Sequence, residues 1–170
     1  MGLGRAGTRR RGLGLTDSIW AIWTVLRVAC PAMKLLTFQA ERFAWKSHSR
    51  TLETASEETV DESVSEACVV FAHAEAKDAD PEERTRVFRH TLKHVKWLAN
   101  KRKLRKVVLH SFTHLGAENA PPDFAEGFLQ ELADRLRSTD YEVWTTPFGW
   151  FCSWEISVYG DSLAKVWKEI

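Results

Sequence analysis

Two apolar runs, each followed by a segment with helical periodicity, restrict the fold of this chain more than any other feature. The runs are residues 67–72 and 107–112, and the helical segments are residues 81–102 and about 122–136. Apolar residues recur three and four positions apart in both segments, which predicts helices with one face packed on a sheet. Strands and helices that alternate in this way are typical of an α/β fold.

The other elements are predicted from weaker patterns. Further strands are expected at residues 34–38, 43–46, 141–144 and 151–157, and a short closing helix at about residues 162–168. The acidic stretch 50–66 has little to bury, so it predicts a loop or a short exposed helix. Asp80 is typical of an N-cap and Pro81 of a first helical position, so a helix is expected to begin there. The sequence therefore predicts a single α/β domain with helices packed on a mixed sheet.

Length and composition agree with one globular domain. The chain has 170 residues, of which 44% are hydrophobic and 28% are charged, as in ordinary globular proteins. Cys30, Cys68 and Cys152 lie far apart and form no CxxC pair, so the sequence supports neither a disulfide framework nor a zinc site. We expect a cytoplasmic location and neither a metal nor a cofactor.

Residues 1–32 differ in character from the rest. Basic residues and glycines precede an apolar stretch at residues 19–26, which Arg27 interrupts. The stretch is too short to span a membrane, and a signal peptide is the alternative that this pattern leaves open. We predict that residues 1–32 are an N-terminal extension, disordered or not part of the domain, and that residues 33–170 form the domain.

A run of ten cations without an acidic residue extends from Arg84 to Lys106. Its helical part places four cations opposite the apolar face, with His90, His94 and Trp97 beside them. These four are Arg86, Arg89, Lys93 and Lys96. Such a stripe suits a phosphate backbone and predicts tRNA contact; the alternative is a solvated surface with the acidic residues 53–66 as its counter-charge.

Four histidines were considered as ligands or site residues. His90 and His94 are four apart on a helix, but no third ligand is recognisable and the adjacent cations repel a metal ion. His110 lies within a predicted strand, where a histidine usually satisfies a backbone carbonyl. His114 comes just after the same strand, at the end where α/β folds usually bind ligands.

Two segments resemble signatures of the archaeal threonyl-tRNA synthetase editing domain. They are LHSFTHL at residues 109–115 and TPFGWF at residues 146–151, and the resemblance extends over residues 33–170. It implies a fold similar to D-aminoacyl-tRNA deacylases and a homodimer. It also implies hydrolysis of serine wrongly attached to threonine tRNA, with help from the ribose 2′-hydroxyl. Threonine and serine differ by one methyl group, worth only about 1–3 kcal/mol of discrimination, so a second sieve is needed.

The resemblance also implies site residues. Three are carried over as catalytic: His114, Cys152 and Lys165. Six are carried over as substrate-binding: Ala74, Phe112, Pro147, Phe148, Gly149 and Phe151. Cys152 stands where the family has a lysine, Phe151 where it has a tyrosine, and Lys165 where it has a pocket glutamate.

These departures leave four explanations open. Catalysis is lost, the substrate is changed, the amine of Lys165 occupies the space left at Cys152, or Cys152 and His114 form a nucleophilic pair. The sequence thus predicts a stand-alone editing domain that acts in trans on the acceptor end of aminoacyl-tRNA, with a threonyl-tRNA synthetase as a further partner. The alternative is a binding module or synthetase accessory subunit that lacks the chemistry.

Overall fold

The computed structural model of the protein describes Met1 and residues 33–170, so the prediction for residues 1–32 concerns a segment outside the described residues. The described part holds six strands, two α-helices and two short 3₁₀ helices. They are β1 (Lys34–Arg50), β2 (Asp61–His73), η1 (Ala76–Ala79), α1 (Pro81–Lys101), β3 (Lys106–Ser111), α2 (Pro122–Arg137), β4 (Glu142–Thr145), β5 (Trp150–Val158), η2 (Ser162–Ala164) and β6 (Lys165–Glu169). The predicted α/β class is confirmed.

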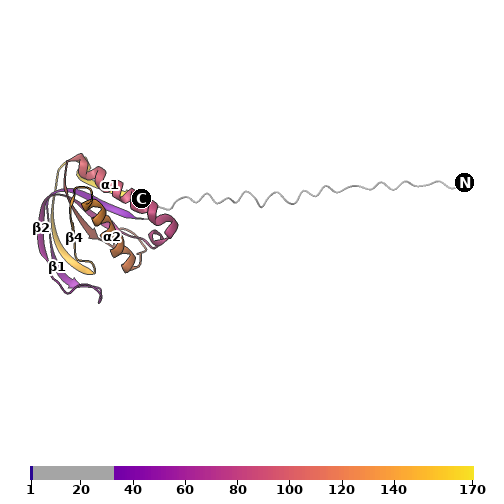
Figure 1. Cartoon of the computed structure of the whole chain (residues 1–170), viewed down its shortest axis with the longest axis horizontal. Coiled ribbons are helices and arrows are strands. Elements are labelled where there is room, and N and C mark those ends of the chain that lie inside the picture. The colour runs from indigo at the N-terminus through magenta and orange to yellow at the C-terminus, as the bar shows by residue number, and fades with distance from the viewer. Residues whose placement is uncertain (2–32) are drawn as a thin grey trace. The chain divides into compact units, whose positions relative to one another are not determined.

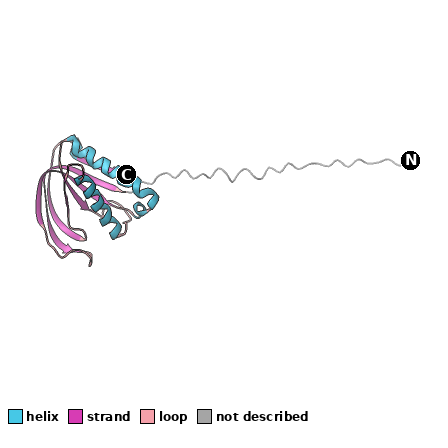
Figure 2. Ribbon diagram, in the orientation of Figure 1, coloured by secondary structure: helices cyan, strands magenta, loops and turns pink. Residues whose placement is uncertain are grey.

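The six strands form one mixed sheet in the order β4-β3-β2-β1-β5, with β6 beside the first part of β1. The strands β2, β3 and β4 are parallel, whereas β1 is antiparallel to β2, β5 and β6. Figure 1 shows the strands as a curled sheet, with α1 and α2 on the same face. Figure 2 shows the same two layers, helices in cyan and strands in magenta.

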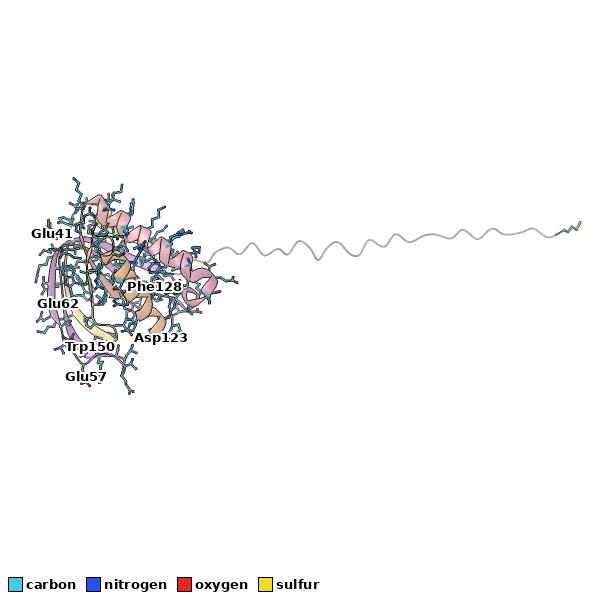
Figure 3. All side chains as sticks on the ribbon, in the orientation of Figure 1. Glu41, Glu57, Glu62, Asp123, Phe128 and Trp150 are labelled. Atoms are coloured by element: carbon cyan, nitrogen blue, oxygen red, sulfur yellow. The ribbon has the colours of Figure 1, made fainter. Side chains whose placement is uncertain are left out.

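The main core lies between the sheet and the two helices. Leu98 of α1, Phe128 and Leu132 of α2 and Leu35 of β1 are almost fully buried in it. Phe128 is labelled in Figure 3 beside α2, and its ring contacts that of Phe88 of α1 with the centroids 5.5 Å apart. A second, aromatic cluster occupies the other face of the curled sheet, where Phe71 makes edge or tilted ring contacts at 4.8–6.1 Å.

The predicted start of α1 is confirmed. The Asp80 side chain accepts a hydrogen bond from the backbone N–H of Glu82 at 3.0 Å, and Pro81 is the first helical residue. One detail of this helix differs from the prediction: His94 is buried, with Nε2 3.3 Å from the Thr37 hydroxyl, and so does not lie on the basic face.

Three predicted elements were wrong. The two strands predicted at 34–38 and 43–46 are one 17-residue strand, because β1 continues through irregularities near Ala40 and Ser47. The prediction of a loop or short exposed helix at 50–66 was wrong only in part: residues 51–60 form a loop, whereas β1 ends at Arg50 and β2 begins at Asp61. A strand with one face in water can form without apolar residues on that face.

The third error is the closing helix predicted at 162–168. Only η2 is helical, and β6 follows it. In β6 the backbone pairs with Lys34–Phe38, and Val166 is the one residue of the strand that is half-buried. Pairing with the free edge of β1 therefore overrides the short helical pattern.

Candidate functional site

A cavity of about 300 Å³ opens at the carboxyl ends of β2 and β3. It is closed by the start of α2, the turn between β4 and β5, and the first residues of β5. Its lining consists of Thr51, Leu52, Ala72, Ala74, His110, Ser111, Phe112, Thr113, His114, Asn119, Ala120, Pro122, Ala125, Pro147, Phe148, Gly149, Trp150, Phe151, Cys152 and Trp154. In Figure 3, Trp150 and Asp123 mark this end of the sheet and of α2.

The structure brings eight of the nine predicted catalytic and substrate-binding residues to this cavity. They are Ala74, Phe112, His114, Pro147, Phe148, Gly149, Phe151 and Cys152. The ninth, Lys165, is exposed in β6 with its Cα paired to that of Phe38, and it is not part of the lining. The arrangement in which the Lys165 amine fills the space beside Cys152 is therefore not present in this structure.

The loop that carries His114 is attached to the end of β2 by three successive residues. The carbonyl of Ala72 accepts the backbone N–H of Phe112 at 2.9 Å, and the carbonyl of Ala74 accepts that of Ala120 at 2.9 Å. Between them, His73 bonds to the middle of the loop through both ring nitrogens. The His114 ring contacts the edge of Phe112, with the ring centroids 5.3 Å apart.

The turn between β4 and β5 is hydrogen-bonded to the segment after β1. Gly149 has a φ of 75°, and its carbonyl accepts the backbone N–H and the hydroxyl of Thr51 at 2.7 and 2.8 Å. The Trp150 indole N–H donates to the carbonyl of Ser56 at 2.9 Å. These bonds fix the side of the cavity that Phe148 and Phe151 line.

No Asp, Glu, Lys or Arg is among the residues that line the cavity. Burial lowers the pKa of His110 to about 4, and burial also raises the pKa of the Cys152 thiol. The His110 ring and the Cys152 thiol are therefore both neutral at neutral pH. A ligand here meets imidazole, hydroxyl, amide and thiol groups and aromatic rings, and no carboxylate, ammonium or guanidinium group.

A thiolate nucleophile at Cys152 has no structural support. Activation requires a lowered thiol pKa or a base within hydrogen-bond reach. Burial acts in the opposite direction on Cys152, and no hydrogen bond joins it to His114 among the interactions of the described residues. The Cys152–His114 pair shares a cavity without forming a catalytic contact.

Sequence reasoning missed two residues that build the site. The Thr146 hydroxyl lies 2.8 Å from Nδ1 of His110, which joins the end of β3 to the turn that carries Phe148. His73 is buried beneath the His114 loop and does not line the cavity. The only sequence signal for His73 is a histidine that directly follows an apolar strand.

The predicted tRNA-binding face lies on α1. Arg89 and Lys93 are exposed, Lys96 is half-buried, and within residues 33–170 none of the three forms an ion pair. Arg86 differs, because Glu83 neutralises it at 2.7 Å.

The proposed counter-charge for this face is not formed. In the acidic stretch, Asp61 pairs with Lys46 at 2.9 Å and Glu57 pairs with Arg50 at 3.4 Å, both on β1. Trp97, 42% exposed, lies on α1 near the three unpaired cations. Cations and an exposed aromatic ring on one helix are features of RNA-binding surfaces.

No helix within the described residues is long and apolar enough to cross a membrane.

Comparisons with known proteins identify the relatives of this chain. The chain is similar to threonine–tRNA ligases of Methanopyrus kandleri (25% identity over 138 residues), Staphylothermus marinus (29% over 142) and Pyrobaculum calidifontis (30% over 135). These matches cover 79–81% of this chain, which spans only 22% of the length of each ligase.

A solved structure titled c-Myc DNA Unwinding Element Binding Protein is similar in fold. The TM-score is 0.57 at 14% identity, with 81% of this chain and 98% of that chain covered. The D-aminoacyl-tRNA deacylase-like fold predicted from the sequence is thereby confirmed. A family model described as the archaea-specific editing domain of threonyl-tRNA synthetase matches residues 33–170. The chain therefore belongs to the family of archaeal-type threonyl-tRNA synthetase editing domains, whose general function is the editing of aminoacyl-tRNA.

Proposed function

We propose that this domain hydrolyses the ester of mischarged tRNA, with serine on threonine tRNA as its substrate. The observation that carries the proposal is the convergence of His114, Phe148, Gly149 and Cys152 on one cavity whose lining contains no Asp, Glu, Lys or Arg. A volume of about 300 Å³ is at the lower end of small-ligand pockets and suits an aminoacyl group with part of its terminal nucleoside. The phosphates of the acceptor end remain outside it.

The proposed chemistry is ester hydrolysis assisted by the ribose of the substrate. Water attacks the ester carbonyl carbon, the bond from that carbon to the ribose 3′ oxygen breaks, and the products are free serine and tRNA with a 3′-hydroxyl. The ribose 2′-hydroxyl relays the proton of the water to the leaving 3′ oxygen. Because the lining holds no Asp, Glu, Lys or Arg, the contribution of the protein is to position the ester and to direct polar groups toward it.

His114 and the backbone of its loop are the polar groups that the proposal assigns to water or the ester. The loop is fixed by backbone bonds to β2, so little reorganisation is needed when charge develops on the carbonyl oxygen. Phe148 packs against the main core and forms a wall beside the aminoacyl group. A threonyl side chain carries one methyl group more than a seryl side chain, and a rigid wall is what excludes such a group.

The rest of the tRNA is proposed to contact α1. Arg89, Lys93 and Lys96 have no ion-pair partner among the described residues and face solvent at least in part. Arg86 contributes less, because its pairing with Glu83 must be lost first. A cytoplasmic location, a homodimer and association with a threonyl-tRNA synthetase belong to the same proposal, and sedimentation of the purified chain tests the homodimer.

A second candidate function is a binding module that holds aminoacyl-tRNA without cleaving it. The observation that favours it is the lack of a charged group in the lining, with a neutral thiol at Cys152 where the family has a lysine.

One experiment separates the two functions. Threonine tRNA carrying labelled serine is incubated with the protein, with the correctly charged threonyl ester as control, and release of the amino acid is followed. Editing predicts rapid release of serine and slow release of threonine. Binding of a non-hydrolysable 3′-amide analogue without ester loss would support the binding module, and neither binding nor ester loss would reject both.

A further inference from the structure

The most unusual buried polar group near the cavity is His73, which no part of the chemistry above uses. Its side chain is only 1% exposed, and it lies beneath the loop that carries His114. Nδ1 accepts the backbone N–H of Leu115 at 3.2 Å, so the proton resides on Nε2, which donates to the carbonyl of Glu118 at 2.8 Å. One ring thus satisfies a donor and an acceptor of the same loop.

The position of these two bonds in the loop gives them a function. Phe112 and Ala120, at the two ends of the loop, are held by the carbonyls of Ala72 and Ala74. His73 holds the residues between them, and Leu115 is the neighbour of His114 in sequence. Among the described residues, these two ring bonds are the only hydrogen bonds between the centre of the loop and β2.

The loop also lies close to charged groups beneath it, at Gly116. A Cβ on Gly116 would overlap Glu75 Oε1, lie 2.8 Å from Lys34 Nζ and lie 3.0 Å from His73 Nε2. Lys34 and Glu75 form a largely buried ion pair, which Lys77 also approaches at 3.2 Å. The loop therefore lies directly on a fixed polar layer, and glycine at 116 is what allows this close approach.

We propose that His73 is a positioning residue of the site: it sets the loop so that the His114 ring lies at the cavity beside Phe112. A histidine fits this task because its neutral ring presents an acceptor and a donor on opposite sides. The proposal rests on the proposed function insofar as His114 acts there on the aminoacyl ester. The geometric part, that His73 places His114, is independent of any activity.

Three substitutions separate the two bonds. His73→Leu removes both and leaves the Leu115 N–H and the Glu118 carbonyl without partners. In His73→Asn the amide oxygen takes the place of Nδ1 and retains the acceptor for Leu115. In His73→Gln the amide nitrogen takes the place of Nε2 and retains the donor for Glu118. The matched control is His94→Leu, which removes another buried histidine, one that bonds to Thr37 on the far side of the core.

The first measurement needs no substrate. In the full-length protein, the exchange rate of the Leu115 amide hydrogen and the NMR signal of the His114 ring are recorded for each variant. In His73→Leu we expect exchange at Leu115 to rise by roughly tenfold and the His114 signal to move as it loses its contact with the Phe112 ring. His73→Asn should restore slow exchange at Leu115 better than His73→Gln, and His94→Leu should change neither signal.

The second measurement links the loop to the site. Ester hydrolysis, or binding of the 3′-amide analogue if no hydrolysis occurs, is measured for His73→Leu, His114→Ala and the double variant. We expect kcat, or the analogue affinity, to fall roughly tenfold to a hundredfold in His73→Leu. The double variant should be no worse than His114→Ala alone, because His73 acts through His114.

The proposal is overturned if the Leu115 and His114 signals of His73→Leu match those of wild type, or if the two single effects on activity add in the double variant. A wild-type protein that neither cleaves nor binds the analogue would reject the proposed function instead. In that case the exchange rate and the ring signal still decide whether His73 positions His114.

Discussion

Nδ1 of His110 lies 2.8 Å from the hydroxyl of Thr146, and this contact joins the carboxyl end of β3 to the turn between β4 and β5. Both residues are buried, at 7% exposure each. His110 also packs edge-on against Phe71, with the ring centroids 4.8 Å apart. A charged imidazolium has no counter-ion here, which is why burial lowers the pKa of His110 to about 4.

Two buried groups give the stability of the fold opposite dependences on pH. His110 has a folded-state pKa of about 4 against 6.5 for the free group, so its contribution is present above about pH 6.5 and is lost as the pH falls through 4. Burial raises the pKa of Asp78 from 3.8 to about 7, although Lys77 and Lys34 lower it in part. The Asp78 contribution is thus present below about pH 4 and lost as the pH rises through 7.

We therefore expect the free energy of unfolding to rise only weakly with pH between about pH 4.5 and 6.5 in the wild-type protein. In Asp78→Asn the opposing contribution is gone, so stability should rise with pH across this range by an amount on the order of 3 kcal/mol. Burial also lowers the pKa of His94, so His94, like His110, makes the free energy of unfolding rise with pH. Urea unfolding at the two pH values measures the difference, and the same weak rise in Asp78→Asn would contradict the assignment.

Gly149→Ala should destabilise the protein by about 2 kcal/mol. The φ of 75° at this position is unfavourable for alanine, and a Cβ would lie 2.9 Å from Cβ of Ala55 and 3.0 Å from Cβ of Leu52. Gly127→Ala is the matched control. Gly127 lies inside α2 with nothing within 4 Å of a Cβ, so alanine should stabilise there by about 0.5–1 kcal/mol. Thermal unfolding of both variants measures the two effects. Equal melting temperatures for the two variants would refute the requirement for glycine at position 149.

Replacing Arg89, Lys93 and Lys96 with Gln should weaken tRNA binding and reduce its salt dependence. Each lost phosphate contact removes about 0.7–0.9 from the slope of log affinity against log salt, so three contacts remove about 2–3. The control replaces Arg42, Lys46 and Arg135 with Gln, which removes the same charge from other exposed positions. If both triple variants weaken binding equally, α1 acts only through the net charge.

The sequence predicted the elements whose signals are local. The cap at Asp80, the apolar face of α1 and the cluster of cavity residues around His114 and Phe148 were all found where expected. The cap and the helix face have signals in short-range spacing, whereas the cavity residues were expected from two contiguous motifs that resemble those of the family.

Features set by long-range pairing were not predictable in the same way. The strand β6 forms because the edge of β1 is free over Lys34–Phe38, and this pairing carries Lys165 to a position outside the cavity lining. His73 bonds to residues more than 40 positions away in sequence, and no local pattern indicates such partners. The absence of Asp, Glu, Lys and Arg from the cavity likewise depends on which distant segments meet there.

The last prediction concerns Cys152 and Phe151, where this chain departs from the family pattern. Because burial raises the pKa of the Cys152 thiol, little thiolate forms at neutral pH, and Cys152→Ser should change the rate of ester hydrolysis less than threefold. Lys165→Ala should also be mild, since Lys165 lies outside the cavity lining, whereas His114→Ala should impair the reaction by roughly tenfold or more.

The double change Cys152→Lys with Phe151→Tyr restores the ammonium and the phenol of the family. Hydrolysis that appears only in this double variant would identify the wild-type chain as a binding module. A large loss in Cys152→Ser would revive the thiol as nucleophile, because serine preserves the shape of the side chain but not its acidity.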